Sequence, residues 1–376
     1  MALLRFGSDT RGASALKSLL DECSVPQLPA PGDRLLAQLA AAVGVPPEQQ
    51  PACIAEAIAR ADLALKAAAA CGAAAVPWCA PGYPQLLREI SDPPILLWLR
   101  GDVECLSHPA VAIVGSRRAT PAGLAMARRL GRELALSGLT VVSGLARGVD
   151  GAAHEGALEV NGRAVAVLGC GVDLVYPPDH RVLAARVRER GAIVSEFPPG
   201  TPPLAHHFPL RNRIISGLVP AVIVIEAGEK SGSLITARQA LEQGRDVLAV
   251  PGNALSGRYR GSHALIRDGA PLVETVEDVL EELGRPVRTG PRARDEGAVD
   301  GADGNPRSKP LELSKLERQM DIGELYSLDQ LIDRTGLNGP ALLAEIGALE
   351  VAGRVGRLPG GGFVRLDNSG IGGGDG

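Results

Sequence analysis

Between residues 111 and 250, short apolar runs alternate with longer segments of helical character. The runs have the length of β-strands: Val111–Val114, Thr140–Val142, Ala164–Leu168, Ala192–Val194, Ala221–Ile225 and Val247–Val250. Helical stretches separate them: Thr120–Leu136, Val149–Val160, His180–Arg190, Leu210–Leu218 and Ser233–Gln243. Continuous apolar strands that alternate with helices are typical of a parallel sheet covered on both faces. The pattern therefore predicts an α/β fold, a Rossmann-like three-layer domain with a mostly parallel sheet.

The segments around this domain have a different character. The first residues are rich in Ala and Leu, with Leu35, Leu36, Leu39 and Val43 at helical spacing. Residues 285–310 are rich in Gly, Pro and charge and lack periodicity, which indicates a flexible linker. We therefore predict a small helical N-terminal domain (1–80), an extended Rossmann-like domain (81–284), the linker (285–310) and a winged-helix domain (311–368).

The winged-helix prediction depends on capping signals and a hairpin. Ser327 can cap a helix over 328–334 that Gly336 ends, and Asn338 can cap a second helix over 341–351. Residues 354–358 and 363–366 then form a hairpin around a Gly-rich turn, which completes a winged-helix order. The second helix has no Lys or Arg, so we expect this domain to serve protein contacts or regulation rather than strong duplex binding.

Charge is distributed unevenly along the 376 residues. The formal net charge is −4, which by itself argues against a polyanion as partner. Residues 111–270, however, hold 19 Lys and Arg against 13 Asp and Glu, a net charge of +6, whereas the segments before and after them carry −3 and −7. The middle domain is therefore the part of the chain that is expected to bind a polyanion.

The sequence gives no signal for a membrane, a secretory route or a metal. It has no run of about 18 uncharged apolar residues and no charged start followed by a long apolar segment. Its six cysteines are irregularly spaced without a CxxC pair, and the adjacent His206 and His207 are poor joint ligands. We predict a cytoplasmic protein with reduced thiols, no membrane association and no metal.

Candidate site residues follow the strands, because ligands of doubly wound sheets bind at the carboxyl ends of the strands. These loops supply glycines, hydroxyl groups, arginines and helix starts, all suited to phosphate. The candidates, in chain order, are Gly115, Ser116, Arg117, Gly144, Arg147, Gly148, Arg211, Asn212, Arg213, Lys230, Ser231, Gly232 and Ser233. Several such loops at one edge predict an extended phosphate-binding surface, which suits DNA or RNA.

Two nucleotide motifs fail in these loops. The run from Gly169 begins like GxGxxG, but Leu174 occupies the position of the last glycine. Lys230 and Ser231 look like the end of a Walker A motif, but Glu229 stands where glycine is needed. We therefore expect neither a dinucleotide nor ATP, and no cofactor.

The remaining side chains near the loops allow narrower expectations. Arg211 and Arg213 are two positions apart at a helix start, so their side chains should diverge, with one facing a ligand and the other anchoring the loop. Tyr176 and Phe208 are the only aromatic residues near the loops that could stack on bases. His154, within a helical stretch, is expected to be packed rather than catalytic.

Several segments resemble the DNA processing protein A family, known as DprA or Smf. They include VAIVGSRRATPAG (111–123), VVSGLARGVDGAAHEGAL (141–158), AVLGCGVDLVYPPDH (166–180), FPLRNRIISGL (208–218) and SGSLITARQALEQGRDVLAVPG (231–252). The stretches 83–102 and 328–355 resemble the family's entry segment and its C-terminal winged-helix unit.

The resemblance implies a bacterial protein that binds single-stranded DNA in natural transformation, or competence, and that acts in DNA processing and recombination. It implies protection of incoming DNA, loading of the recombinase RecA, homodimerisation through the Rossmann-like domain and no enzymatic activity. It also implies that Gly115, Ser116 and Arg117 belong to the DNA pocket together with Arg211 and Arg213.

Two other interpretations remain open. A Rossmann-like hydrolase of nucleoside monophosphates would use the same phosphate-binding loops and would need a carboxylate base, for which Glu196 and Glu226 at strand ends are candidates. A purely structural partner protein would have no affinity for nucleic acid.

Overall fold

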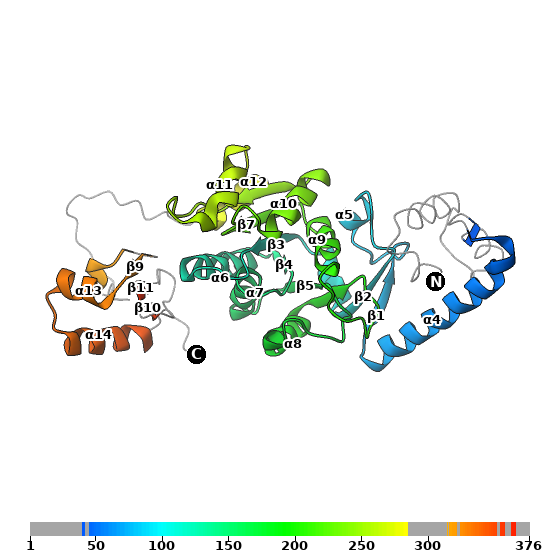
Figure 1. Ribbon diagram of the computed structural model, residues 1–376, viewed down its shortest axis with the longest axis horizontal. Helices are drawn as coiled ribbons and strands as arrows, with labels where there is room; N and C mark the ends of the chain where they lie inside the picture. The colour runs from blue at the N-terminus through cyan, green and yellow to red at the C-terminus, as the bar shows by residue number, and fades with distance from the viewer. Residues whose placement is uncertain are drawn as a thin grey trace, which may run out of the picture. The chain divides into compact units, whose positions relative to one another are not determined.

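The computed structural model describes residues 40–41, 45–284, 314, 316–321, 324–351, 354–357 and 362–365. The chain divides into two compact units (Figure 1). The larger unit comprises Met1–Ala119 and Met126–Arg285, and the smaller unit comprises Thr120–Ala125 and Pro286–Gly376. The expected helix around Leu35 lies almost entirely outside the described residues. The expected linker, residues 285–310, lies entirely outside them.

The larger unit contains a sheet of eight strands in the order β1-β2-β6-β5-β4-β3-β7-β8. Six neighbouring strands are parallel: β3 (Ala110–Gly115), β4 (Thr140–Ser143), β5 (Ala164–Leu168), β6 (Ala192–Ser195), β7 (Ala221–Ile225) and β8 (Asp246–Ala249). The mostly parallel α/β sheet is therefore confirmed. The sequence did not predict β1 (Ala74–Pro77) and β2 (Leu96–Gly101), which add an antiparallel edge beside β6.

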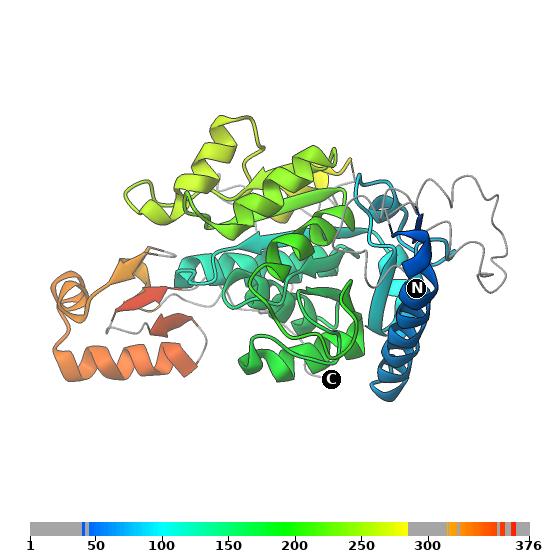
Figure 2. The same cartoon turned by 45° about the vertical axis from the view of Figure 1, so that its right-hand side comes forward.

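Helices cover both faces of the sheet (Figures 1 and 2). On one face lie α6 (Pro121–Leu136), α7 (Val149–Glu159) and α8 (Arg181–Arg190); on the other lie α9 (His207–Gly217) and α10 (Gly232–Glu242). The connection after β3 therefore leads to one face and the connection after β7 to the other, although these two strands are neighbours. Such a point is a topological switch, where ligands of open α/β sheets bind.

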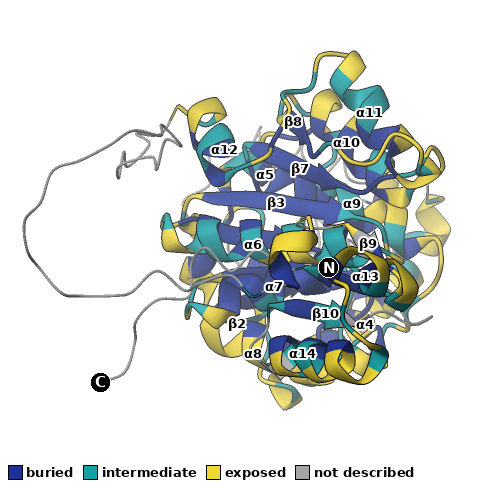
Figure 3. Ribbon diagram, turned by 90° about the vertical axis from the view of Figure 1, so that its left-hand side faces the viewer, coloured by how far each residue is buried: buried dark blue, intermediate teal, exposed yellow. Residues whose placement is uncertain are grey.

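The core of the larger unit has two layers, one on each face of the sheet. The central strands β3 and β7 are buried along almost their whole length (Figure 3). On β5, Val165 and Val167 pack into one layer, whereas Ala164, Ala166 and Leu168 pack into the other. Both sides of each strand are therefore apolar, which explains why the strands read as continuous apolar runs rather than as alternating patterns.

Further helices complete the larger unit: α4 (Gln50–Ala70), α5 (Gln85–Arg88), α11 (Arg260–Arg267) and α12 (Val276–Glu282). The longest of them, α4, buries Ala57, Ala61, Ala64 and Ala68, one residue per turn. The last two pack into the same layer as Trp98 of β2, so this helix is attached to the edge of the sheet.

The C-terminal segment has the predicted order of helix, turn, helix and hairpin. Its elements are β9 (Leu325–Tyr326), α13 (Leu328–Thr335), α14 (Gly339–Val351), β10 (Val355–Arg357) and β11 (Phe363–Arg365), and β9 is a third strand that the sequence did not predict. Ser327 caps α13 in a capping box with Gln330, and Gly336 ends it at a φ of 67°. The winged-helix fold is thus confirmed.

No helix in the described part of the chain is long and apolar enough to span a membrane.

Candidate functional site

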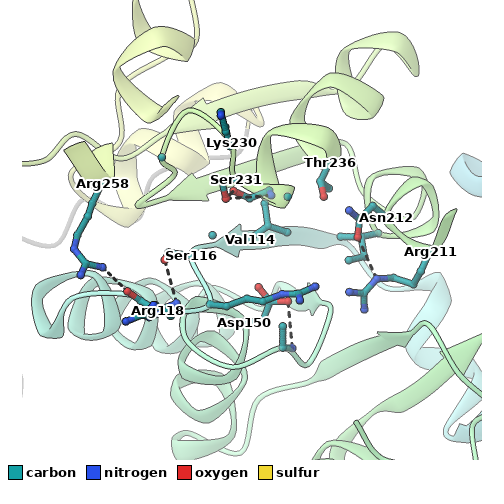
Figure 4. Close-up of a pocket in the computed structure, with 17 residues that line it drawn as sticks. Val114, Ser116, Arg118, Asp150, Arg211, Asn212, Lys230, Ser231, Thr236 and Arg258 are labelled. Atoms are coloured by element: carbon teal, nitrogen blue, oxygen red, sulfur yellow. Dashed lines mark hydrogen bonds between the residues drawn. The ribbon is translucent and has the colours of Figure 1, made fainter. Parts of the chain in front are cut away.

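A pocket of about 590 Å³ opens at the switch point between β3 and β7 (Figure 4). Four loops, which follow β3, β4, β7 and β8, form its wall together with α9. The lining residues are Val114, Gly115, Ser116, Arg117, Arg118, Ala146, Asp150, Arg211, Asn212, Ile215, Gly228, Lys230, Ser231, Gly232, Ser233, Thr236 and Arg258. Nine of the thirteen residues predicted from the sequence therefore meet in one pocket, whereas Gly144, Arg147, Gly148 and Arg213 do not line it.

Positive charge dominates the pocket lining. Arg117, Arg118, Lys230 and Arg258 are exposed, and Arg211 is buried in the wall. Among the lining residues Asp150 is the single carboxylate. Four exposed cations against one buried anion make the pocket a favourable place for an anionic ligand.

Arg211 is held beneath the pocket by the ends of two strands. Its side chain donates hydrogen bonds from Nη1 to the carbonyl oxygens of Gly144 (2.8 Å) and Val167, and Nε donates to Oδ1 of Asn212. Burial lowers the pKa of Arg211 to about 10, although the nearby Asp150 carboxylate acts in the opposite direction. A pKa of this value keeps the guanidinium charged at neutral pH, so Arg211 joins α9 to β4 and β5 and contributes a fixed positive charge to the pocket.

Asp150, at the start of α7, is the buried counterpart of Arg211. Its Oδ2 accepts hydrogen bonds from the backbone N–H groups of Gly144 (3.1 Å) and Ala146 (3.4 Å). Burial raises the pKa of Asp150, and the Arg211 guanidinium and the two N–H groups oppose that rise. The carboxylate thus organises the loop after β4 and compensates the buried guanidinium.

Two glycines of this region are required by packing. A Cβ on Gly144 would lie within 2.7 Å of three atoms of the Arg211 guanidinium. Gly148 has a φ of 79°, and a Cβ there would meet the carbonyl oxygen of Ser116 at 2.2 Å. Both predicted glycines therefore shape the pocket from behind and do not contact its interior.

The loop after β7 presents a helix start to the pocket. Ser231 caps α10, its Oγ accepting from the N–H of Ser233, and Ser233 and Thr236 in the first turns line the pocket. The N-terminal N–H groups and the dipole of an eleven-residue helix favour an anion at this position.

Arg258, which the sequence pattern did not reveal, belongs to the loop after the last parallel strand. Its Nη1 donates to the carbonyl oxygen of Arg118 (2.6 Å) and lies 3.5 Å from Oε1 of the buried Glu226. Arg258 therefore connects this loop to the one after β3. Counting the carboxyl end of β8 with the five earlier loops would have found it, because parallel strands all end at the same edge.

Arg213 and Arg147 have ionic partners outside the pocket. Arg213 binds Oδ2 of Asp92 (3.1 Å) and Oε1 of Glu196 (2.7 Å), and these carboxylates raise its pKa although burial opposes them. The side chains of Arg211 and Arg213 thus diverge, as their spacing predicted. Arg147 pairs with Asp179 on the surface. Arg213 therefore joins α9 to the segments that hold Asp92 and Glu196, and Arg147 joins the loop after β4 to the short helical turn Pro178–His180.

An aromatic pair extends the edge of the pocket. The guanidinium carbon of Arg117 lies 5.4 Å from the ring centroid of Phe208, and this ring lies 5.5 Å from that of Tyr176. Tyr176 is 43% exposed. The two aromatic residues singled out in the sequence therefore form one row with Arg117, of a kind on which nucleic-acid bases stack.

Two histidines near the site, His207 and His154, are buried. Nδ1 of His207 lies 3.2 Å from the carbonyl oxygen of Gly169, and the ring stacks on Phe197. Within the described residues no group of three His, Cys, Asp or Glu side chains is arranged to hold a metal ion. His154 is fully buried in α7, and burial lowers its pKa to about 3.

Replacement of His154 by methionine is expected to make the folded protein less sensitive to mild acid. The neutral imidazole is required in the folded state, but the unfolded chain binds a proton below a pH of about 6.5. Stability contributed by this group is therefore lost as the pH falls, by about 2 kcal/mol between pH 7 and pH 5. Denaturant titrations of both proteins at the two pH values should show a smaller loss for His154→Met, and equal losses would contradict a buried neutral imidazole.

Comparisons with known proteins agree with this architecture. The family model "DNA recombination-mediator protein A" matches residues 75–284, and the model "DprA winged helix domain" matches residues 323–361. Protein Smf of Escherichia coli (strain K12) is 42% identical over 286 residues, 76% of this chain and 75% of that protein. DNA processing protein DprA of Streptococcus pneumoniae is 46% identical over 201 residues, 54% of this chain and 71% of that protein.

Two solved structures are also similar. The X-ray structure of DNA processing protein A from Streptococcus pneumoniae has a TM-score of 0.65 and 36% identity, covering 74% of this chain and 95% of that one. A structure of DNA processing protein A from Helicobacter pylori, described for its single-stranded DNA binding mode, has a TM-score of 0.51 and 31% identity, covering 56% of this chain and 95% of that one.

Proposed function

Because the chain belongs to the DNA recombination-mediator protein A family, we propose that it binds single-stranded DNA with the pocket at the switch point. The single observation that carries the proposal is the convergence of Arg117, Arg118, Lys230 and Arg258 on a pocket whose lining includes one carboxylate. The binding of single-stranded DNA by the Helicobacter pylori relative supports it.

In this proposal, each part of the pocket has a physical role. The exposed cations neutralise phosphates, and the N-terminus of α10 with Ser231 and Ser233 donates hydrogen bonds to phosphate oxygens. Bases stack on the row of Arg117, Phe208 and Tyr176. Arg211, Asn212 and the glycines keep the wall in shape, while Arg213 and Arg147 hold the neighbouring loops.

The finer functions rest on the family and stay proposals. We propose that the bound strand is protected and handed to the recombinase RecA during natural transformation, in the cytoplasm, and that the protein works as a homodimer through its Rossmann-like domain. A dimer would hold a longer strand and gain avidity. We propose no enzymatic activity.

The charges beside the pocket argue against the hydrolase of nucleoside monophosphates. Glu196 is paired with Arg213, and neither Glu196 nor Glu226 lines the pocket. Asp150 is the carboxylate that lines the pocket. It accepts two backbone hydrogen bonds and is influenced by the charge of Arg211, which suits a structural role better than that of a base. Incubation with nucleoside monophosphates should release no free base.

A competition between strands tests the main proposal. Purified protein, with a labelled single strand of about 30 nucleotides, is titrated with unlabelled single-stranded or duplex DNA of the same sequence at several salt concentrations. We expect the single strand to compete at least tenfold better, and its affinity to fall steeply with salt because exposed cations supply most contacts. A preference for duplex would overturn the proposal, and an absence of binding would favour a structural partner protein.

A further inference from the structure

Among the residues that the structure describes, helix α8 carries a concentration of unpaired positive charge outside the pocket. Its sequence, RVLAARVRER, includes Arg181, Arg186, Arg188 and Arg190 but a single acidic residue, Glu189. All four arginines are exposed. In the described part of the chain none of the four side chains has a hydrogen bond or an ion pair, unlike those of Arg128 and Arg129 in α6.

The helix dipole accounts for only part of this charge: it favours Arg188 and Arg190 in the last turn but not the arginines before them. Arg181 lies in the first turn, where the helix dipole disfavours a cation, and no acidic residue accompanies it there. Arg186 and Arg190 are four residues apart, a spacing at which like charges repel. The helix is instead held by Leu183, Ala184 and Val187, which are buried against the sheet. The outward arginines are therefore available to an external anion.

The helix begins where the aromatic row leaves the pocket. Arg117 lies against Phe208, Phe208 lies against Tyr176, and the short helical turn Pro178–His180 leads directly from there into Arg181. His180 and Asp179 of this turn are attached to the loop after β4, His180 through the carbonyl oxygen of Leu145 and Asp179 through Arg147. This fixes the start of α8 beside the pocket.

We propose that single-stranded DNA leaving the pocket passes over Phe208 and Tyr176 and continues along α8, with its phosphates on Arg181 and Arg188. These two residues are seven positions apart and thus lie on the same flank, about 10 Å from each other along the helix axis. The proposal rests on the proposed function and extends it, because it turns a pocket for a few nucleotides into a track for a longer strand.

The test compares a short and a long strand on the full chain. An oligonucleotide of about six nucleotides occupies the pocket alone, whereas one of about 30 nucleotides also reaches α8. The variant R181Q/R188Q should bind the short strand like wild type and the long strand five- to tenfold more weakly. The slope of log affinity against log salt for the long strand should fall by about 1.4, because two phosphate contacts are lost.

The matched control is R128Q/R129Q, which removes the same charge from α6, where both arginines have acidic partners. It should bind both strands like wild type. The proposal would be overturned if R181Q/R188Q bound the long strand as tightly as this control does. It would also be overturned if the loss of affinity were confined to duplex DNA, or if it were seen only in R186Q/R190Q, whose arginines lie on the other flank of the helix. Failure of wild type to bind the short strand would instead contradict the proposed pocket, so the two failures are distinguishable.

Discussion

Replacement of Arg211 by methionine is expected to lower the free energy of unfolding of the larger unit by about 3–5 kcal/mol. The change removes the positive charge that lies near the buried carboxylate of Asp150, and it deprives the carbonyl oxygens of Gly144 and Val167 of a donor. An orphaned buried charge costs far more than an unmade surface contact, because water cannot replace the lost partner. Urea denaturation followed by circular dichroism measures the difference.

Two further variants separate this explanation from a general loss of charge. Arg163→Met removes an exposed arginine of the same unit and should change stability by less than about 0.5 kcal/mol. The double variant D150N/R211M should be more stable than the sum of the single changes predicts, since asparagine keeps an acceptor for the backbone but carries no charge. If Arg211→Met is as stable as Arg163→Met, the guanidinium is not part of the buried framework.

The order of strands and helices in the larger unit could be predicted because each strand lies between two apolar layers. Val165, Val167 and their neighbours on β5 are apolar on both sides, so the strand is visible in the sequence without knowledge of its partners. The antiparallel strands β1 and β2 gave no such signal, because they stand at the edge and outside the regular alternation. Their place depends on pairing with β6, which is a tertiary contact.

The site could be predicted to the level of loops but not of side-chain roles. Gly144 and Arg211 are 67 residues apart, and only the folded chain shows that the glycine makes space for the guanidinium. Arg258 contributes to the pocket from a short helical turn after the last strand, in a segment without a phosphate-binding motif. The sequence places a group at an edge of the sheet, whereas burial and ion pairing decide whether that group holds the fold or faces a ligand.

Arg117 faces the ligand and does not hold the fold. Arg117→Ala is expected to weaken the binding of single-stranded DNA at least tenfold, which corresponds to about 1.4 kcal/mol of binding free energy. Its side chain is exposed in the pocket, lies over Phe208 and has no hydrogen bond or ion pair among the described residues. Its removal therefore takes away a phosphate contact and part of the stacking row without disturbing the framework. Gel-shift titrations at about 100 mM salt measure the change.

The choice of controls makes the result for Arg117 specific. Arg117→Lys keeps the positive charge but loses the planar fork, so it should bind with intermediate affinity. Arg238→Ala removes an equally exposed arginine from α10, outside the pocket, and should bind like wild type. All three variants should unfold like wild type, because surface changes of this kind seldom alter stability by more than about 0.5 kcal/mol. Wild-type affinity in Arg117→Ala would mean that the strand does not enter the pocket at the switch point, since an exposed cation in its lining would contact a phosphate bound there.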